Sequence, residues 1–371
     1  MALITQMMEK AIAAQQEGNI EEAEQLYREV LFAEPSHVDA NHNLGVLLVS
    51  EYRANDALVF LRLALEENRN VEQFWLSYIQ TLIFMDDLDK AIEAIESAKL
   101  VGFSGTKFDN LLKSTLTPAQ LYAAGELFMA TDGNYLDFLK ALHKNIYEGY
   151  FEIGTRTGVS LALSNSPSVS IDPFFQLNTN PVGNKDLCLM FQETSDSFFE
   201  NRLSLLSDIK CQLAFIDGMH LFEYALRDFI NLAKISSEKS LFLFHDTIPW
   251  TFEMTTRNYK DLPRGAAWTG DVWKLAHIFI DAGMKDNVKL LTSAPSGLLA
   301  VLSPDKKSVS MLENNYDRIC SEWLEVNLSG DTIERFYETG LFAKPQVYLQ
   351  HLKNISFGNK AENLSREWVS H

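Results

Sequence analysis

The sequence contains little cysteine and no long apolar run. Its cysteines, Cys188, Cys211 and Cys320, are odd in number and widely spaced, which fits neither a disulfide framework nor a zinc knuckle. No segment approaches the roughly 20 consecutive apolar residues of a membrane-spanning helix, and the first residues lack the pattern of a signal peptide. These absences predict a protein of the reducing cytoplasm with no membrane partner.

Positive charge is also scarce. The chain has 32 Lys and Arg against 50 Asp and Glu, a formal net charge of −18, and no dense basic run offsets it. Such a chain repels nucleic-acid phosphates, so we expect no nucleic-acid partner. Its 371 residues, of which 46% are hydrophobic, exceed what one core usually organises, and we expect at least two globular domains.

Small residues recur with a 34-residue period near the N-terminus, at Ala23, Ala57 and Ala91. Apolar residues at spacings of three and four predict a pair of helices in each repeat. With Leu44-Gly45 and Trp75 in register, residues 1–105 resemble about three tetratricopeptide repeats, although Tyr52 replaces the glycine between two helices. The resemblance implies an all-α array that binds a protein partner. We interpret residues 106–146 as a helical connector that caps the array.

A cofactor-type turn is predicted at residues 150–163. A short apolar strand, Tyr150–Ile153, precedes Gly154 and Gly158, and we expect a helix to follow. Gly154 allows close approach of a ligand, while Glu152 can accept a hydrogen bond from a ligand amine. The Gly-x-Gly-x-x-Gly and Walker motifs are absent, which argues against a dinucleotide or a nucleoside triphosphate.

Acidic residues follow several of the predicted strands. Asp172 ends the strand at 168–171, where a carboxylate can bind two ribose hydroxyls. Ser195 and Asp196 follow the strand at 187–192. Two further strands end in Asp217-Gly-x-His220 and in His245-Asp246, and strand ends of a parallel sheet face a ligand crevice. We therefore expect the last four residues to form one cluster.

Together the motifs Glu-Ile-Gly-Thr-x-x-Gly, Ile-Asp-Pro, Phe-Ile-Asp-Gly-x-His and His-Asp resemble the class I S-adenosylmethionine-dependent methyltransferases of the small-molecule O-methyltransferase branch. The resemblance covers residues 147–305 and implies a Rossmann-like α/β domain with a mainly parallel sheet, completed by strands at 288–291 and 297–302. It implies that the methyl donor is held by Glu152, Gly154 and Gly158 around its methionine part, by Asp172 at the ribose, and by Ser195 and Asp196 near the adenine. We expect Thr155 and Asp217 to be further cofactor-binding residues.

Two interpretations of the cluster stay open. In metal-dependent relatives the matching positions bind a divalent cation, which here implies Asp217, His245 and Asp246 as ligands of Mg²⁺ or a similar ion. In the other interpretation, His220 or His245, with Asp217 beside them, takes the proton of the attacking hydroxyl. Hydrogen bonds that only tie the loops, or a helix cap at His220, would explain the same residues without chemistry.

A long insert after His245-Asp246 is interpreted as a substrate lid. Its aromatic and polar candidates for substrate contact are Trp250, Trp268, Trp273, Arg257, Arg264 and Asp271, and Asp271 is also placed to cap the helix that follows it. Residues 306–371 are predicted to be a helical extension.

We expect O-methylation of a hydroxylated small molecule, with a sugar or glycan as first choice. The alternatives are a partner-binding repeat protein with a non-catalytic α/β domain, and a protein methyltransferase whose repeats dock the target.

Overall fold

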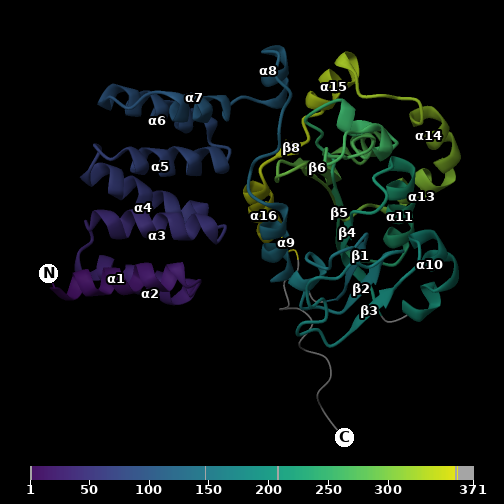
Figure 1. The fold of residues 1–371 in the computed structure, drawn as a ribbon, viewed down its shortest axis with the longest axis horizontal. Coiled ribbons are helices and arrows are strands. Elements are labelled where there is room, and N and C mark those ends of the chain that lie inside the picture. The colour runs from purple at the N-terminus through teal and green to yellow at the C-terminus, as the bar shows by residue number, and fades with distance from the viewer. Residues whose placement is uncertain (1, 147, 207–208, 356, 358–371) are drawn as a thin grey trace, which may run out of the picture. The chain divides into compact units, whose positions relative to one another are not determined.

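The computed structural model of the chain describes residues 2–146, 148–206, 209–355 and 357 (Figure 1). The chain divides into two compact units, residues 1–121 and 122–371. In neither unit does the described chain include a helix long and apolar enough to cross a membrane.

The first unit is an array of antiparallel helices (Figure 1). Successive hairpins are made by α1 (Ala2–Gln16), α2 (Ile20–Ala33), α3 (Val38–Ser50), α4 (Ala54–Glu67), α5 (Glu72–Phe84) and α6 (Leu88–Val101). The predicted repeat is confirmed, because Ala23, Ala57 and Ala91 are fully buried where helices cross. The last hairpin is covered by α7 (Thr106–Lys113), which buries Phe108 and Leu111 against it.

The turns inside the hairpins repeat with the same period. Gly18, Tyr52 and Asp86 all have left-handed backbone angles, with φ of 81°, 58° and 63°. Only glycine adopts this conformation without a steric cost, so the second and third turns are strained in a way that the first is not. This position of the repeat therefore keeps its left-handed backbone conformation whichever residue occupies it.

The second unit is built on one eight-stranded sheet with the order β3-β2-β1-β4-β5-β7-β6-β8. The strands are β1 (Tyr150–Ile153), β2 (Ser168–Ile171), β3 (Cys188–Phe191), β4 (Cys211–Ile216), β5 (Ser236–His245), β6 (Val288–Leu291), β7 (Leu298–Leu302) and β8 (Phe342–Ala343). All neighbours pair in parallel except β7, which is antiparallel to both β5 and β6. The expected mainly parallel α/β sheet and its final strand pair are confirmed.

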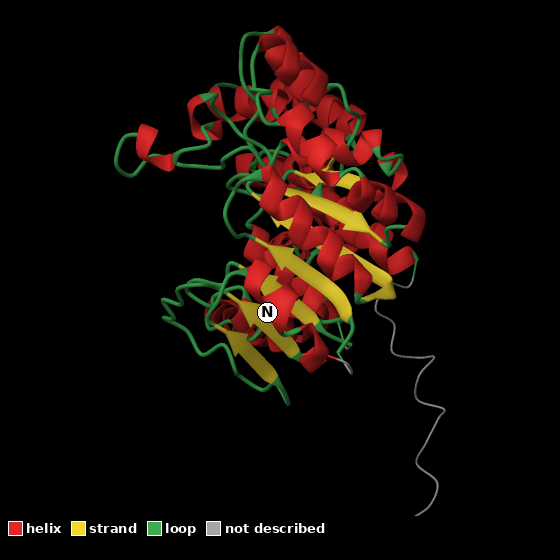
Figure 2. Ribbon diagram, turned by 90° about the vertical axis from the view of Figure 1, so that its right-hand side faces the viewer, coloured by secondary structure: helices red, strands yellow, loops and turns green. Residues whose placement is uncertain are grey.

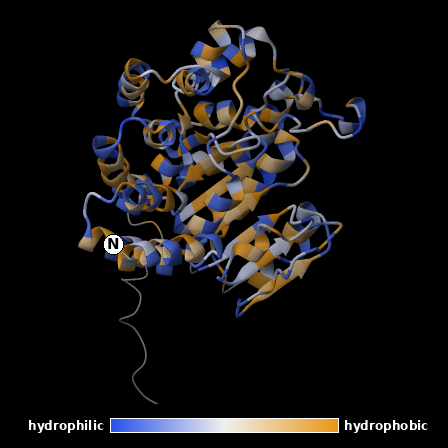
Figure 3. Ribbon diagram, turned by 60° about the vertical axis from the view of Figure 1, so that its left-hand side comes forward, coloured by the Kyte–Doolittle hydropathy of each residue, from blue (hydrophilic) through white to orange (hydrophobic). Residues whose placement is uncertain are grey.

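Helices flank the strands of this unit, and the strands themselves are largely apolar (Figures 2 and 3). On one face, α11 (Phe222–Lys234) and α12 (Lys274–Asp281) pack Phe229 and Phe279 against Phe244 of β5. On the other, α9 (Tyr135–His143) places Tyr135 on Phe215 and His143 on Tyr150. The remaining helices are α8 (Pro118–Ala123), α10 (Ser195–Asn201), α13 (Lys306–Asn314), α14 (Tyr316–Trp323), α15 (Gly330–Tyr337) and α16 (Pro345–Asn354).

The prediction of a helix after Gly158 is wrong. Only a 3₁₀ turn, Leu161–Leu163, is present, and Ser164 is already extended. The Ser164 hydroxyl accepts a hydrogen bond from the Ser166 backbone, and Pro167 disfavours a helical residue before it. The glycine turn therefore has no helix N-terminus at which to bind an anion.

Two segments also differ from their predicted descriptions. Within 106–146, α7 packs on the repeats, whereas α9 covers the sheet of the second unit. The extension after residue 305 is helical except for β8, which adds a strand to the sheet beside β6. Its last residues, 358–371, lie outside the described part.

Candidate functional site

The candidate site lies where β1, β2, β4 and β5 end. Because these strands are parallel and adjacent, in the order β2-β1-β4-β5, the residues that follow them meet at one edge of the sheet. β2 lies on one side of β1, and β4 and β5 lie on its other side, so the order of the strands reverses at β1. Ligands of open α/β sheets bind at such a reversal of strand order.

Gly154 brings the ends of β1 and β4 together. It has a φ of 89°, and a Cβ at this position would lie 2.1 Å from the backbone oxygen of Asp217. The Asp217 amide donates to the Ile153 carbonyl at 2.8 Å, and the Gly154 amide donates to Ile171 of β2 at 2.9 Å. No residue with a side chain fits here, so the glycine is required by the close packing of three strand ends.

Glu152 is a fully buried carboxylate one residue before the end of β1. The Tyr150 hydroxyl donates a hydrogen bond to its Oε2, whereas Oε1 has no partner in the described chain. Burial raises the pKa of Glu152 to about 7, although the nearby hydroxyls of Tyr150, Thr155 and Ser160 favour the ionised form. A buried carboxylate oxygen without a partner is costly, and a ligand that donates to it would remove that cost.

The rest of the glycine turn is tied to β2. The hydroxyls of Thr155 and Ser170 are 2.6 Å apart, and Asp172 accepts hydrogen bonds from the backbone amides of Arg156 at 2.8 Å and Phe174 at 2.7 Å. A Cβ on Gly158 would lie 2.9 Å from the Thr179 hydroxyl oxygen. Asp172 thus holds the turn, and each of its oxygens retains capacity for a further hydrogen bond.

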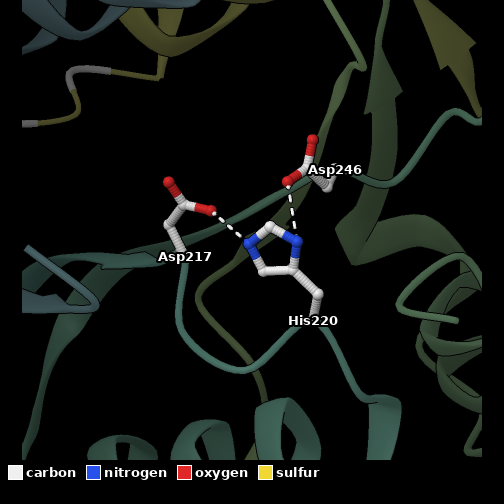
Figure 4. Close-up of side chains that lie close together, drawn as sticks. All are labelled: Asp217, His220 and Asp246. Atoms are coloured by element: carbon white, nitrogen blue, oxygen red, sulfur yellow. Dashed lines mark ion pairs between the residues drawn. The ribbon is translucent and has the colours of Figure 1, made fainter. Parts of the chain in front are cut away.

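The four residues predicted to cluster do come together. The imidazole of His220 lies between two carboxylates, with Nε2 3.3 Å from Asp217 and Nδ1 3.2 Å from Asp246 (Figure 4). His245 Nδ1 lies 3.5 Å from Asp217 and 3.2 Å from Asp246, without forming a hydrogen bond to any described residue. The Ser296 hydroxyl donates to Asp246. Two carboxylates and two imidazoles thus share one small volume.

Charge coupling shifts the proton equilibria of the cluster. Burial opposes ionisation, but Asp217 and Asp246 outweigh it and raise the pKa of His245 to about 10. Burial likewise opposes a charge on His220, yet the same carboxylates raise its pKa. Despite burial, the two histidines lower the pKa of Asp217 well below its usual range. The two carboxylates thus favour the protonated form of His245.

The backbone of the cluster is strained. His220 and Asp246 have left-handed φ angles of 55° and 60°. Such angles cost of order 1–3 kcal/mol for a residue other than glycine and persist only where the surrounding structure imposes them. They agree with a site whose side chains are held in place by their surroundings.

A single metal ion would find a ligand set that differs from the predicted one. Ligand atoms of Asp217, His220 and Asp246 lie within 4.8 Å of one another. His220 therefore takes the place that the sequence interpretation gave to His245, whose side chain is only 9% exposed. Two carboxylates and one imidazole suit several divalent cations.

Ser195 and Asp196 lie in the first turn of α10, apart from the cluster. Both oxygens of Asp196 are bound by the Arg227 guanidinium of α11, at 2.6 and 2.5 Å. Burial raises the pKa of Asp228 to about 7, and the nearby Ser195 hydroxyl opposes this shift. The side chains of Ser195 and Asp196 thus both interact with residues of α11.

The segment predicted to be a lid packs on the turn that carries His220. The Trp268 ring stacks on His220 at 5.0 Å, and the Trp268 carbonyl oxygen lies 3.2 Å from His220 Nδ1. A Cβ on Gly270 would lie 1.8 Å from the His220 carbonyl oxygen, which accepts a hydrogen bond from the Asp271 amide at 3.1 Å. The lid segment 268–271 thus fixes the position of His220.

The polar lid residues mainly contact one another. Asp271 accepts hydrogen bonds from the Phe222 amide at 2.9 Å, from Arg257 at 2.5 Å and from Lys274 at 2.8 Å. It caps α11, so the predicted cap of its own helix is wrong: α12 begins at Lys274 with Trp273 before it. Trp273 is buried, while Trp250 and Trp268 are partly exposed and Arg264 is exposed.

One residue of the site was not predicted. Tyr135, the first residue of α9, packs its ring 4.4 Å from that of His245 and 5.9 Å from that of Phe215. It precedes the first strand, and no motif surrounds it. Only the packing of α9 over the sheet brings it to the strand ends.

The chain matches no family model and no curated protein. Among solved structures it is similar to the TPR2B domain of yeast Sti1 in a complex with pHsp70, at 15% identity, over 31% of this chain and 97% of that one, with a TM-score of 0.29. It is similar to the first TPR of Spaghetti (RPAP3) bound to an HSP90 peptide, at 17% identity over 30% and 89% of the two chains, with a TM-score of 0.29. The Arabidopsis OM64 TPR domain is similar at 14% identity, over 31% and 95%, with a TM-score of 0.29. The N-terminal helical repeats thus resemble TPR domains, and likenesses of this extent assign neither a partner nor an activity.

Proposed function

We propose that the α/β unit is a Rossmann-like, S-adenosylmethionine-dependent methyltransferase. The observation that carries the proposal is the buried carboxylate of Glu152, whose Oε1 has no partner among the described residues, beside the close contact of Gly154 with the end of β4. A buried acceptor at the reversal of strand order suits the ammonium group of an amino-acid-like cofactor. Asp172, on the neighbouring strand, has oxygen acceptors left for a ribose diol.

The acid and histidine cluster fits a methyl transfer to oxygen. Bound S-adenosylmethionine would supply a methyl group on a positively charged sulfur. The protein then has to align the acceptor and receive its proton. His220 is the better base, because its side chain is 20% exposed whereas that of His245 is 9% exposed. His245 instead neutralises Asp217 and Asp246.

The cluster also fits a divalent cation such as Mg²⁺. Asp217, His220 and Asp246 would hold it, and the ion would orient the acceptor oxygens and lower the pKa of the attacking hydroxyl. His220 cannot be both a ligand and the base through the same nitrogen. Whether the site binds a metal ion therefore distinguishes a metal-assisted reaction from one in which His220 is the base.

The acceptor that suits this site best is a hydroxylated small molecule, a sugar or glycan above others. The partly exposed Trp268 ring borders the cluster, and stacking on an indole is a common way to hold a sugar ring. Asp217 and Asp246 offer acceptors for neighbouring hydroxyls.

A second candidate function rests on the helical repeats. Stacked hairpins form an extended surface that suits a polypeptide partner. The array would then recruit a partner to an α/β unit that is non-catalytic, or dock a protein whose side chain is methylated. Acidic side chains outnumber basic ones about twofold in residues 1–121, which favours a partner that is not itself acidic.

Calorimetric titration with S-adenosylmethionine tests the main proposal. We expect the wild type to bind, Asp172→Asn to bind at least about tenfold more weakly because a charged acceptor is lost, and Asp286→Ala, an exposed carboxylate of the same unit, to bind normally. A wild type that does not bind, or an Asp172→Asn protein that binds equally well, refutes the proposal.

Manganese binding, followed by electron paramagnetic resonance, tests the cation. Asp246→Asn should weaken Mn²⁺ binding and leave the affinity for S-adenosylmethionine nearly unchanged. If the wild type binds no Mn²⁺ with or without the donor, the metal-assisted reaction is refuted. The reaction in which His220 acts as the base then remains.

A further inference from the structure

Strand β1 carries two polar side chains on one face of the sheet. Tyr150 and Glu152 are two residues apart, and alternate residues of a strand point to the same side. Both are fully buried, and the residues between and after them, Phe151 and Ile153, are apolar. Burying a hydroxyl and a carboxylate costs free energy that two apolar side chains would avoid. The stability of the sheet therefore does not explain this pair.

The Tyr150 ring is held from several sides. Its backbone amide donates to the Pro167 carbonyl at 2.9 Å. Strand pairing sets it beside Ser168 of β2 and Leu213 of β4. The ring of His143, from α9, packs against it at an interplanar angle of 88°, with the ring centroids 4.5 Å apart. A ring enclosed in this way directs its hydroxyl to one place.

That hydroxyl is bound to one oxygen of Glu152. It donates its hydrogen bond to Oε2. Burial and the Glu152 carboxylate raise the pKa of Tyr150 well above its ordinary value, so the phenol keeps its proton and remains the donor. Because a carboxylate is planar, holding one of its oxygens also restricts the direction of the other. Tyr150 thus orients the whole carboxylate of Glu152.

The other oxygen of Glu152 is left for a ligand. Oε1 is buried and has no hydrogen-bond partner among the residues that the structure describes, although the hydroxyls of Thr155 and Ser160 lie near the carboxylate. The Thr155 hydroxyl is 2.6 Å from that of Ser170. Tyr150 is the first residue of β1 and lies before Glu152, away from the carboxyl edge where ligands bind. The phenol therefore does not obstruct a ligand that donates from that edge.

We propose that Tyr150 is a positioning residue of the donor site, which turns Glu152 so that Oε1 accepts a hydrogen bond from the ammonium group of S-adenosylmethionine. The inference rests on the proposed methyltransferase function and concerns how one end of the donor is recognised. Tyr150 itself does not touch the donor. Without the phenol the carboxylate is free to rotate, and binding the ammonium group then costs the ordering that the phenol now provides.

A double-mutant cycle, measured by calorimetric titration of the full chain with S-adenosylmethionine, tests the inference. Tyr150→Phe keeps the ring and removes the hydroxyl, and we expect its affinity to fall by about 3- to 30-fold. In a Glu152→Gln background the same change should cause no further loss, because the carboxylate that the phenol orients is already gone. Tyr337→Phe is the matched control. It removes another buried hydroxyl of the same unit, one that accepts from the Phe128 amide, and should leave the affinity unchanged.

Equal losses from Tyr150→Phe in the wild-type and Glu152→Gln backgrounds would show that the hydroxyl acts independently of Glu152. Unchanged affinity in Tyr150→Phe would show that the orientation of the carboxylate is not needed. Either result overturns the inference and leaves the proposed function standing, whereas a wild type that does not bind S-adenosylmethionine overturns both. Thermal unfolding of Tyr150→Phe and Tyr337→Phe shows whether each variant is folded.

A crystal structure of the wild type with S-adenosylhomocysteine gives a second test that needs no variant. This compound has the same ammonium group as the donor. Its ammonium nitrogen should lie within about 3.2 Å of Glu152 Oε1, while the Tyr150 hydroxyl stays on Oε2. An ammonium group bound elsewhere, or a Tyr150 hydroxyl that has left Glu152, contradicts the inference.

Discussion

Glu152→Gln should stabilise the protein at alkaline pH while weakening the donor site. The folded carboxyl has a pKa of about 7, against 4.5 for the ordinary group, because burial disfavours its charge. The folded state therefore retains this proton to a higher pH than the unfolded state. Stability is lost as the pH rises from 4.5 through 7, and the loss is complete above the folded pKa.

The size of the loss follows from the shift. A difference of about 2.5 pH units corresponds to about 3 kcal/mol at pH 8. Glutamine carries no charge and avoids this loss, but its amide nitrogen would replace an oxygen that already lacks a partner, at a cost of about 1–2 kcal/mol. We therefore expect Glu152→Gln to be more stable than the wild type by about 1–2 kcal/mol at pH 8, and not at pH 5.

Urea unfolding followed by tryptophan fluorescence measures this difference. A Trp75→Phe background confines the remaining tryptophans to residues 122–371, so that the signal reports the α/β unit. Glu253→Gln, an exposed glutamate of the same unit, is the control and should show no pH-dependent difference. If Glu152→Gln changes stability equally at pH 5 and pH 8, the raised pKa of Glu152 is refuted. The same variant should bind S-adenosylmethionine about 10- to 100-fold more weakly, because a charged hydrogen bond is lost.

Two further substitutions test the packing of each unit. Gly154→Ala places a Cβ 2.1 Å from the Asp217 carbonyl in a left-handed conformation, so we expect a loss of at least about 2 kcal/mol and of donor binding, and normal binding would contradict the required close approach. Gly45→Ala places a Cβ 2.6 Å from buried Leu61, and we expect it to destabilise the repeats by about 1–2 kcal/mol in a urea titration monitored at Trp75. Donor affinity should remain normal in Gly45→Ala, and a parallel loss of it would show that the two units do not act independently.

The helical repeats could be predicted from the sequence because their pattern is local. A helical hairpin is specified by residues within 34 positions, and the buried alanines mark where its helices cross. Tyr52 shows the limit of such a pattern. It departs from the expected glycine, yet the turn at that position keeps the same left-handed geometry.

The strand-end residues could be predicted for a related reason. An apolar run followed by an acid places that acid at the carboxyl edge of a buried strand, and parallel strands collect these edges in one place. Asp217, His220, His245 and Asp246 therefore come together as expected. The choice between the two histidines could not be predicted, because it depends on which ring is enclosed by the neighbouring elements.

Contacts between distant segments account for most of the differences between the predicted and the observed structure. Asp196 has a bidentate partner in Arg227, 31 positions away, and Asp271 caps α11 rather than its own helix, 49 positions away. A helix after Gly158 was expected from the strand and glycine turn before it, but the serines and Pro167 limit it to one 3₁₀ turn. In each case the observed structure depends on which hydrogen-bond partner a polar group contacts in the folded chain.

By itself, the sequence determined the repeat period, the buried strands and the acids at their ends, because each depends on neighbours along the chain. Only the tertiary structure decided that His220 is more exposed than His245, that the predicted lid packs on His220, and that β8 joins the sheet. It also brought Tyr135 to the strand ends through the Asp132–Lys344 ion pair, whose residues are 212 positions apart. Such contacts depend on how α9, the β6–β7 loop and the C-terminal segment pack together, and no local pattern encodes that packing.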